Sequence, residues 1–324
     1  MVLEANRAQP EPGVSIMRGK DGELPMVAMS ISGEDSSGDL LRQEQRESFR
    51  YGLMTPFRGQ TRTYSIKTLR SGAEHGFVEK IGDCNFKVIS EYAFLTATID
   101  RLYRSVYPGR ATRNPELTTK RILQSLSHPR TILELILYGE EPVGYGIFPR
   151  LDIGGEPVLY SSRAILPEHI QEGLGTHILG RAIVQHRRES ARRRPLHNGF
   201  LMTQRWESIK SLEGLKERDL VEKIQPIDEP FDEEGAKLLF IVHSQVRVNS
   251  RGIESTGRSR RELIEVGLNE NLEIPKDGTR GSEIFHKIVN RPPEGAGVNL
   301  YDGDVVYVRF IIPEATEAEA ISGK

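Results

Sequence analysis

The sequence is poor in cysteine: Cys84 is the only one among 324 residues. A single cysteine excludes an intramolecular disulfide framework and a zinc site built from several cysteines. It fits a reducing compartment, and we expect a cytoplasmic protein. No argument for a metal ion starts from this cysteine.

Long apolar runs are also missing. The most apolar segments, Ile132–Tyr138 and Val305–Ile312, have the length of strands, whereas a helix that spans a membrane needs about 20 apolar residues in succession. The first residues carry no apolar segment of the kind found in signal peptides. We therefore expect a soluble protein with no membrane contact.

An excess of either charge is absent as well. The chain has 44 Lys and Arg against 46 Asp and Glu, a formal net charge of −2, which excludes a globally basic nucleic-acid binder and a strongly acidic disordered chain. Charge is instead concentrated in two arginine clusters, one made of Arg187, Arg188, Arg192, Arg193 and Arg194, the other of Arg258, Arg260 and Arg261. No aromatic residue is interleaved with the first cluster, so a nucleic-acid partner that stacks its bases has no support. A solvated helix end and a site for an anionic partner are the interpretations left open.

The length alone suggests about two domains, or one domain with extensions. Residues 1–72 are rich in Gly, Ser, Pro, Glu and Gln without a sustained apolar period, which predicts a polar, largely flexible extension. Within it, Asp39–Tyr51 fits a short polar helix and Thr61–Leu69 fits an added strand. The rest divides into a single domain at 73–313, with a core at 84–215 and an elaborated part at 216–313, and a flexible tail at 314–324.

Apolar spacing predicts the helices. Residues at i, i+4, i+7 and i+11 form one face of a first helix, which Pro108 ends: Leu95, Ile99, Leu102 and Val106. The further helices expected are 115–128, 173–190, 207–215, 232–246, which Asp232 can cap, and 282–289. The helix at 173–190 has one apolar face, made of Leu174, Ile178, Leu179, Ala182 and Ile183.

The strands expected are Asn85–Ile89, Ile132–Tyr138, Val143–Leu151, Val158–Leu166, Phe200–Thr203 and Val305–Ile312. Short turn-forming links at 139–142 and 152–156 join the second, third and fourth of these strands, so an antiparallel meander is their natural pairing. Together with the helices, this order predicts an α/β (α+β) fold with a mixed, mostly antiparallel central sheet flanked by helices.

The most informative segment joins strand 158–166 to the helix that follows it. It contains Gly173-Leu174-Gly175, but G-x-G also occurs at Gly144/Gly146 and Gly295/Gly297, so the pattern alone does not discriminate. Only the first of the three lies between a predicted strand and an amphipathic helix. There the backbone N–H groups of a helix N-terminus favour a phosphate or pyrophosphate. A turn that needs glycine only for packing, and a different phosphate-bearing ligand, are the alternatives.

At this point the sequence resembles the GNAT superfamily of acyl-CoA-dependent N-acyltransferases. In that family the fourth strand ends in an apolar-x-Pro segment and leads into R/Q-x-x-G-x-G/A, which opens the third helix and holds the CoA pyrophosphate. Here the two segments read Ile165-Leu166-Pro167 and Ile170-Gln171-Glu172-Gly173-Leu174-Gly175. The order of elements over residues 84–215 agrees as well. The sequence departs from the family at Ile170, where Arg or Gln is usual, and Gln171 stands beside it.

The resemblance implies a GNAT-like fold that binds acetyl-CoA or coenzyme A as co-substrate, without a metal, between the fourth and fifth strands. It implies that the backbone of Ile165 and Leu166 pairs with the pantetheine arm. The pyrophosphate cradle that it implies consists of Gln171, Glu172, Gly173, Leu174, Gly175 and Thr176.

Catalytic groups are not assigned by the resemblance. Many GNAT members carry a Tyr on the fourth helix that protonates the departing thiolate, whereas Ser211 or Leu212 stands near that place here. Ser208 or Thr203 near the thioester, Glu134 as a base, and water are the candidates. For Glu134, an exposed strand carboxylate is the other interpretation.

Three further residues have structural and functional interpretations. His169 is expected to be exposed beside the glycine turn, and His243 is expected to be packed or hydrogen-bonded in an apolar helix. Trp206 is expected to anchor the core, or to border an acyl pocket.

The sequence therefore predicts an N-acyltransferase, most simply an acetyltransferase, in which an amine attacks the acyl thioester directly. The alternative is a catalytically inactive GNAT-like module that binds a ligand or a protein. The acceptor, a small-molecule or protein amine, is not identified by the sequence. The oligomeric state is not identified either, and a homodimer is compatible with it.

Overall fold

In the computed structural model the chain divides into two units, residues 1–47 and 48–324, and every residue that the structure describes belongs to the second. The described residues are 53–72, 74–81, 86–89, 92–108, 115–190, 194–203, 205–246, 258–259, 275–276, 278–290 and 305–314. The predicted helix Asp39–Tyr51, most of the second arginine cluster and the tail beyond residue 314 lie outside them.

The strands are β1 (Leu53–Arg58), β2 (Thr63–Arg70), β3 (Val78–Lys80), β4 (Phe86–Val88), β5 (Thr131–Tyr138), β6 (Glu141–Ile153), β7 (Glu156–Ile165), β8 (Asn198–Thr203), β9 (Lys223–Gln225), β10 (Arg258–Ser259) and β11 (Val305–Ile311). The helices are α2 (Ala93–Val106), α4 (Pro115–Ser127), α5 (Leu174–Ser190), α6 (Trp206–Lys216), α7 (Glu233–Val246) and α8 (Arg280–Val289), with a 3₁₀ turn, η2, at Pro167–His169.

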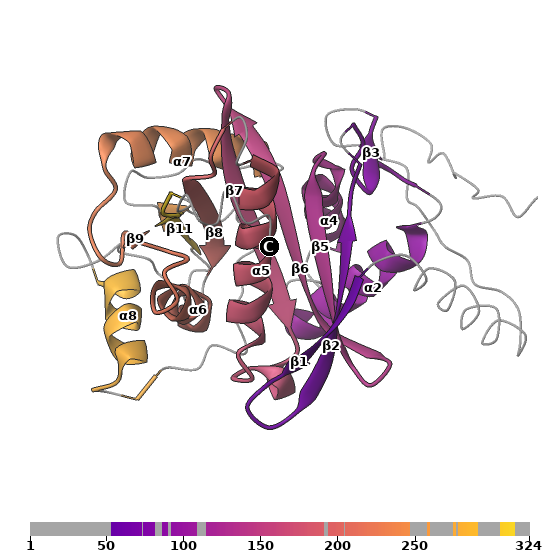
Figure 1. Ribbon diagram of the computed structural model, residues 1–324, viewed down its shortest axis with the longest axis horizontal. Helices are drawn as coiled ribbons and strands as arrows, with labels where there is room; N and C mark the ends of the chain where they lie inside the picture. Colours follow the sequence, from indigo (N-terminus) through magenta and orange to yellow (C-terminus); the bar gives the residue numbers. More distant parts are fainter. Residues whose placement is uncertain are drawn as a thin grey trace, which may run out of the picture. The chain divides into compact units, whose positions relative to one another are not determined.

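One sheet organises the second unit (Figure 1). Its strands lie in the order β1-β2-β5-β6-β7-β8-β11-β10, and β9 also pairs with β11. Among the described pairs, only β7 and β8 run parallel, while the others are antiparallel. The predicted meander is confirmed as β5, β6 and β7. Its two turns use the positive φ of Gly139, Gly154 and Gly155, which glycine adopts without steric cost. β3 and β4 form a separate two-stranded sheet.

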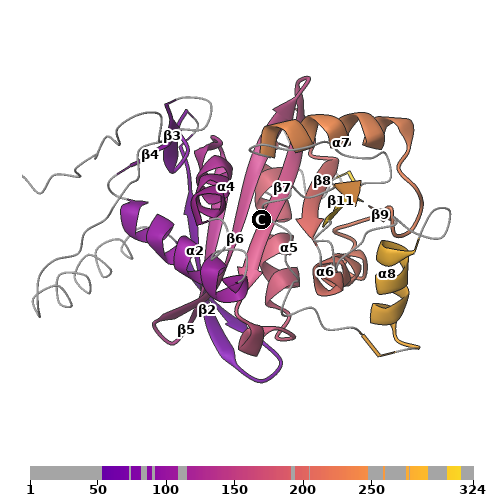
Figure 2. The same ribbon diagram turned by 180° about the vertical axis from the view of Figure 1, so that it is seen from behind.

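Helices cover both faces of the main sheet. α5 lies over one face in Figure 1, and the view from behind in Figure 2 shows α2 and α4 over the other. This is the mixed, mostly antiparallel α/β architecture that the sequence predicted.

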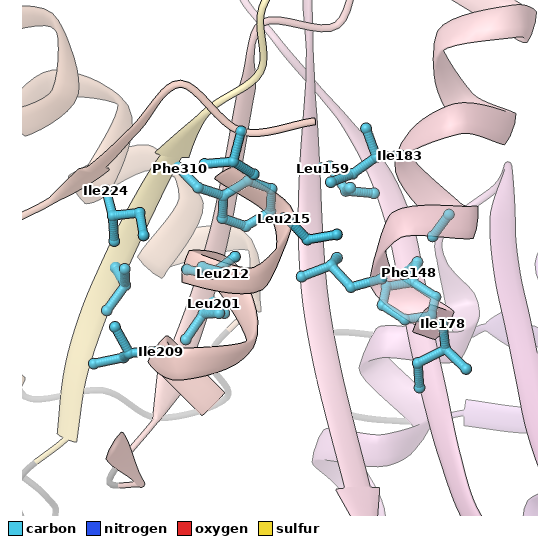
Figure 3. Close-up of a cluster of buried hydrophobic side chains, with 14 of the residues drawn as sticks. Phe148, Leu159, Ile178, Ile183, Leu201, Ile209, Leu212, Leu215, Ile224 and Phe310 are labelled. Carbon is cyan, nitrogen blue, oxygen red and sulfur yellow. The ribbon is translucent and has the colours of Figure 1, made fainter. Parts of the chain in front are cut away.

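The largest core lies between α5, α6, α8 and the sheet (Figure 3). The predicted apolar face of α5 is confirmed, because Leu174, Ile178, Leu179, Ala182 and Ile183 are all buried. Each large aliphatic side chain buried in this way stabilises the fold by about 1.5–3 kcal/mol. The core therefore fixes where α5 begins, directly after the glycine turn.

The other face has two smaller cores. The predicted face of α2 is confirmed, because Leu95, Ile99, Leu102 and Val106 are buried against α4 and the β5 and β6 strands. α7 closes a further cluster with residues of β6, β7, β8 and β11. As predicted, Asp232 caps α7: its Oδ1 accepts a hydrogen bond from the Gly235 N–H at 2.5 Å.

The sheet begins earlier in the chain than the expected boundary at residue 73. β1 and β2 belong to it, and β2 pairs with β5 from Ser65↔Leu137 to Arg70↔Ile132. Tyr64 and Ile66 of β2 are buried in the largest core. Both faces of this strand have a core to cover, because Leu69 belongs to the core on the opposite face of the sheet. The sequence signal for the strand is the alternation within Thr61–Leu69.

None of the helices in the described part of the chain is both long enough and apolar enough to cross a bilayer.

Candidate functional site

The parallel strands β7 and β8 are paired over only part of their lengths. Their register runs from Val158↔Asn198 to Ser161↔Leu201. β7 continues to Ile165 and β8 to Thr203, and these last residues are not paired with one another. We call residues 162–165 of β7 with 202–203 of β8 the β7/β8 fork. At the fork one edge of β7 has no partner strand among the described residues, so its main-chain groups need another partner.

The register between β6 and β7 shows which residues of β7 face the fork. The Leu166 N–H donates to the Val143 oxygen at 2.9 Å, and Ile165 lies opposite Gly144 as the next pair. Successive residues of a strand direct their N–H and C=O groups to opposite edges. Leu166 therefore uses its N–H within the sheet, whereas the main chain of Ile165 and Arg163 faces the fork.

The glycine turn follows η2 and leads into α5. Gln171 and Gly173 both have a positive φ, 74° and 77°. In the first helical hydrogen bond the His177 N–H donates to the Gly173 oxygen at 3.0 Å. The N–H groups of residues 174–176 come before the His177 N–H in the chain, and they are the donors that have no acceptor within the helix at its N-terminus. This is the geometry that favours an anion.

Arg163 brings a positive charge to the same place. Its Nη1 donates to the Gly175 oxygen at 2.7 Å and to the Ser211 Oγ at 2.9 Å, and its Nη2 donates to the Ser208 oxygen at 3.3 Å. All three acceptors are neutral. Burial lowers the pKa of the guanidinium to about 10, so it stays charged at neutral pH. The charge stands beside the first turn of α5 with no carboxylate bonded to it among the described residues.

Arg205 brings a second charge to the end of β8. Its side chain is buried, with 7% of the residue exposed, and its Cζ lies 5.5 Å from the ring centroid of Tyr107, which caps the C-terminus of α2. Among the residues that the structure describes, the Nε and Nη2 atoms of Arg205 have no hydrogen-bond acceptor. The Thr203 Oγ1 accepts a hydrogen bond only from the Arg205 backbone N–H, at 2.8 Å. Sequence reasoning missed Arg163, Arg205 and Tyr107, because no local pattern distinguishes them from other residues of the same types.

Glu172, a member of the predicted cradle, directs its side chain elsewhere. Its carboxylate accepts hydrogen bonds from the Thr61 side chain and from the Thr61 N–H, the latter at 2.8 Å, and these bonds lower the pKa of the carboxyl. Thr61 lies in the hairpin between β1 and β2, and Phe57 of that hairpin stacks on His177 with ring centroids 4.2 Å apart. The hairpin therefore packs on the glycine turn, and only the backbone of Glu172 is free to serve a cradle.

Glu134 is not an exposed strand carboxylate, so that interpretation is wrong. The residue has 0% exposure, and its Oε1 accepts hydrogen bonds from the Arg181 Nε at 3.0 Å and from the Thr68 Oγ1 at 3.1 Å. Burial raises the pKa of the carboxyl, against the opposing effect of Arg181. β6 separates β5 from the fork, so this ion pair joins α5 to the sheet at a distance from the site.

His169 is buried rather than exposed, with 6% exposure. Its Nδ1 lies 3.0 Å from the Tyr64 Oη and 3.1 Å from the Arg62 Nη1, in the same hairpin contact. His243 is hydrogen-bonded as predicted, with its Nδ1 3.1 Å from the Tyr307 Oη. Trp206 packs against the largest core, as expected of an anchor.

The start of α6 carries no tyrosine toward the fork. Leu212 is fully buried in the core, and the Ser211 Oγ is held between the Arg163 guanidinium and the Ser208 carbonyl. Thr203 is engaged with the backbone of Arg205. No side-chain acid or base for the transfer follows from these contacts.

The first arginine cluster lies only partly within the described residues. Arg187 and Arg188 stand in the last turn of α5, where cations complement the helix dipole. Arg194 donates to the Gly155 oxygen and lies 3.9 Å from Asp152. Of the second cluster, only Arg258, on β10, is described.

Within the part of the chain that the structure describes, no three His, Cys, Asp or Glu side chains gather in a way that could hold a metal ion.

No protein-family model matches the sequence, and no curated protein matches it either. Among solved structures, the GNAT domain of S. lividans PAT is similar to this chain with a TM-score of 0.33 and 12% identity, over 52% of this chain and 89% of that one. An acetyltransferase from Thermus thermophilus is similar with a TM-score of 0.27 and 19% identity, over 39% and 79% of the two chains. A cAMP-binding acyltransferase from Mycobacterium smegmatis is similar with a TM-score of 0.29 and 11% identity, over 66% and 60%.

Likenesses at these TM-scores decide neither activity nor substrate. What the structure itself shows is a mixed, mostly antiparallel sheet in which the glycine turn and α5 connect the two parallel strands, β7 and β8. The site is therefore described by the β7/β8 fork, the turn and the two arginines.

Proposed function

We propose that this chain is an acyl-CoA-dependent N-acyltransferase, most simply an acetyltransferase, whose acyl donor binds at the β7/β8 fork. The observation that supports this best is the fork itself. β7 and β8 stop pairing at Ser161↔Leu201, and β7 then runs directly into a glycine turn at a helix N-terminus. One ligand that carries both an amide-containing arm and a pyrophosphate matches both features.

The residues present fit the anionic part of acetyl-CoA. The N–H groups of residues 174–176 are donors for a pyrophosphate, and the Arg163 guanidinium adds a charge beside them. The space between Arg163 and the first turn of α5 is narrow, and glycine at 175 leaves it open: a Cβ built there would lie 3.3 Å from the Arg163 Nη1. Gly173, with its positive φ, keeps the turn in a conformation that other residues rarely adopt.

The fork fits the pantetheine arm. Main-chain groups of Ile165 and Arg163 face the side where β8 no longer pairs, and they supply the hydrogen-bonding edge. Leu166 does not share this role through its N–H, which already donates to the Val143 oxygen.

Acetyl-CoA supplies an acyl thioester, and an amine that attacks it yields an amide, free CoA thiol and no further product. The chain's own task is to hold the donor's arm against β7 and to exclude water beside it. Because α6 offers no tyrosine, the proton that the amine loses passes to solvent water or to the departing thiolate in this proposal.

Calorimetric titration tests the donor site. Acetyl-CoA and CoA should bind the wild-type protein, and Gly175→Leu should weaken both at least about 30-fold, or about 2 kcal/mol, because the new side chain fills the approach to the N–H groups. Leucine is a good helix former, so the helix itself should not be weakened.

Gly72→Leu is the matched control, because a Cβ there has only one atom within 4 Å, at 3.8 Å. It should bind acetyl-CoA as the wild type does. If folded wild-type protein gave no heat with acetyl-CoA, the donor site would be refuted. If acetyl-CoA bound but no free thiol accumulated with any amine in a broad panel, the chain would instead be an inactive binding module.

A further inference from the structure

Arg205 is a buried cation whose charge the described residues do not neutralise. Only 7% of the residue is exposed, no carboxylate lies within ion-pair distance of it among the described residues, and two of its donor atoms, Nε and Nη2, have no acceptor. A buried charge without a partner is costly, and a buried donor without an acceptor adds to that cost. A fold keeps such a group at a site where a ligand supplies the missing acceptors.

The surroundings of Arg205 hold the guanidinium in place without neutralising it. The ring of Tyr107 lies 5.5 Å from its Cζ, a contact that orients a cation but brings no charge. On the other side, Arg205 directly precedes α6, whose N-terminus also favours an anion. A planar guanidinium with two adjacent free donors matches the two oxygens of a carboxylate.

The Arg205 guanidinium lies on the other side of the sheet from the expected place of the pyrophosphate. Arg163 contacts the first turn of α5, on the face of the sheet that α5 and α6 cover. Arg205 contacts Tyr107 at the end of α2, and Tyr107 packs against the core on the opposite face. A donor whose phosphates lie at α5 and whose arm follows the fork therefore directs its reactive end toward the side of Arg205.

We infer that Arg205 binds the carboxylate of the acceptor, and that the acceptor is consequently an amine that carries a carboxylate, such as an amino acid or the C-terminal end of a short peptide. This inference rests on the proposed acyl transfer, because it assigns the acceptor of the same site. Arg205 positions the acceptor through its carboxylate and takes no part in the proton transfer. The acceptor amine loses its proton, the thioester carbon–sulfur bond breaks, and the carboxylate is unchanged.

Paired amines test the inference. Glycine, β-alanine and L-phenylalanine are each compared with their own carboxamide, first by thermal shift and calorimetry without acetyl-CoA, and then as acceptors by release of free thiol. The amides carry the less basic amine, a larger fraction of which is unprotonated at neutral pH, so a preference for the acid as acceptor must come from the protein. We expect at least one acid to bind about 30-fold or more tightly than its amide, equivalent to about 2 kcal/mol.

Arg205→Met should remove this preference, and Arg205→Lys should restore part of it, because lysine keeps the charge but not the two-pronged geometry. Arg218→Met, which removes an exposed arginine just beyond α6, should leave it unchanged. Circular dichroism confirms that each variant is folded. Equal binding of acids and amides by the wild type, or a preference that survives Arg205→Met, overturns the inference.

A second pair of probes, acetyl-CoA and phosphate-free S-acetyl-pantetheine, tests whether Arg205 binds a CoA phosphate instead of an acceptor carboxylate. If Arg205→Met weakened acetyl-CoA binding but not the binding of phosphate-free S-acetyl-pantetheine, Arg205 would hold a CoA phosphate, and the inference would be overturned while the donor site stood. If the acids bound in an Arg205-dependent way but acetyl-CoA did not bind, the donor proposal would fail and the carboxylate site would stand.

Discussion

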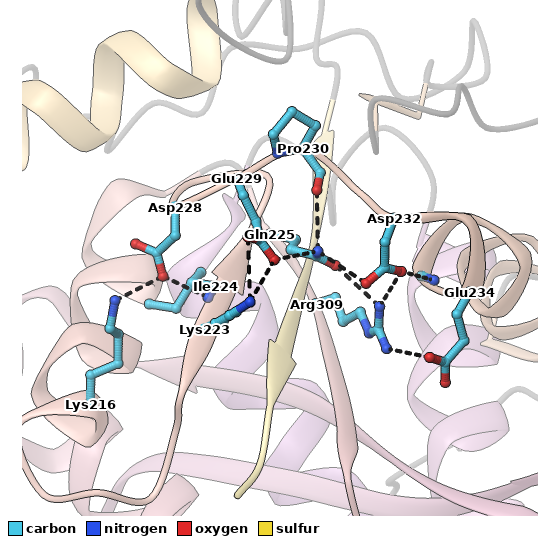
Figure 4. Close-up of polar contacts among 11 residues, drawn as sticks. Lys216, Lys223, Ile224, Gln225, Asp228, Glu229, Pro230, Asp232, Glu234 and Arg309 are labelled. Carbon is cyan, nitrogen blue, oxygen red and sulfur yellow. Dashed lines mark hydrogen bonds and ion pairs between the residues drawn. The ribbon is translucent and has the colours of Figure 1, made fainter.

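Arg309 and Arg205 are both nearly buried arginines, but their surroundings differ in one respect. Arg309, with 3% exposure, has a partner among the described residues for each of its three nitrogen atoms. Figure 4 shows its contacts with Gln225, Asp232 and Glu234. Its Nε donates to the Asn198 Oδ1 at 2.8 Å, and its Nη1 donates to the Asp232 Oδ1 at 2.7 Å. Its remaining contacts are to the Gln225 Oε1 at 3.2 Å and the Glu234 Oε2 at 3.6 Å.

Arg205 has an aromatic ring beside it and, in the described part of the chain, no acceptor for two of its donor atoms. The contrast teaches how a buried cation can be interpreted. A guanidinium that is fully neutralised by its own chain joins elements of the fold, here β8, β9, β11 and the start of α7. One that is left without a counter-charge costs stability, and this cost is acceptable where a ligand offsets it.

The largest effect is expected at the neutralised arginine. Arg309→Met should lower the free energy of unfolding by about 2–3 kcal/mol, because Asn198 and Gln225 lose a charged donor and the carboxylates lose their counter-ion. Asp232 is about half exposed, which keeps the loss below that of a fully buried pair. Urea unfolding followed by circular dichroism measures it. An unchanged midpoint would mean that the network contributes nothing and that the comparison fails.

For Arg205 the expected change in the free energy of unfolding is zero or of the opposite sign. Arg205→Met should leave the stability of the free protein unchanged or raise it by up to about 1 kcal/mol, because it removes an uncompensated buried charge and retains a side chain of similar length. The same urea titration measures this change. A loss as large as that of Arg309→Met would show that Arg205 has a structural partner after all.

Acidification should reduce the difference between the two arginines. The pKa of Asp232 lies below its usual 3.8. Burial alone would raise this pKa, but the hydrogen bond from the Gly235 N–H and the positive charge of Arg309 outweigh burial and lower it. A carboxylate with a depressed pKa stabilises the fold above about pH 4 and loses this contribution as the pH falls through its folded pKa. The stability gap between wild type and Arg309→Met should therefore shrink below pH 4, whereas the effect of Arg205→Met should not change there.

Urea midpoints measured between pH 3 and pH 7 test this smallest of the three effects. A gap that stayed constant to pH 3 would mean that Asp232 is not the acid that Arg309 depends on.

Elements with a dense local pattern could be predicted from the sequence. The apolar face of α5, the turns at Gly139 and Gly154, and the Asp232 cap are each written within one turn or one helix, and the structure confirms them. β2 was visible as alternation in Thr61–Leu69, but nothing local showed that β5, far along the chain, would pair with it.

Contacts between distant residues are the part that could not be predicted. Glu134 reads as an exposed carboxylate because its partner Arg181 stands 47 residues away on α5. His169 reads as exposed because Tyr64 and Arg62 come from a hairpin more than 100 residues earlier. Arg163 and Arg205 differ from other arginines only in what surrounds them. The glycine turn was found because its chemistry is contained within six consecutive residues.

The β7/β8 fork also has a mechanical consequence. On either side of it the strands are held by antiparallel ladders, and within the described residues the two halves of the sheet are joined through only four residue pairs, Val158↔Asn198 to Ser161↔Leu201. A ligand arm lying along the free edge of β7 would act as a short additional strand and lengthen this seam. Occupancy would then stiffen the whole sheet, with the amides at the end of β7 gaining the most protection from hydrogen exchange.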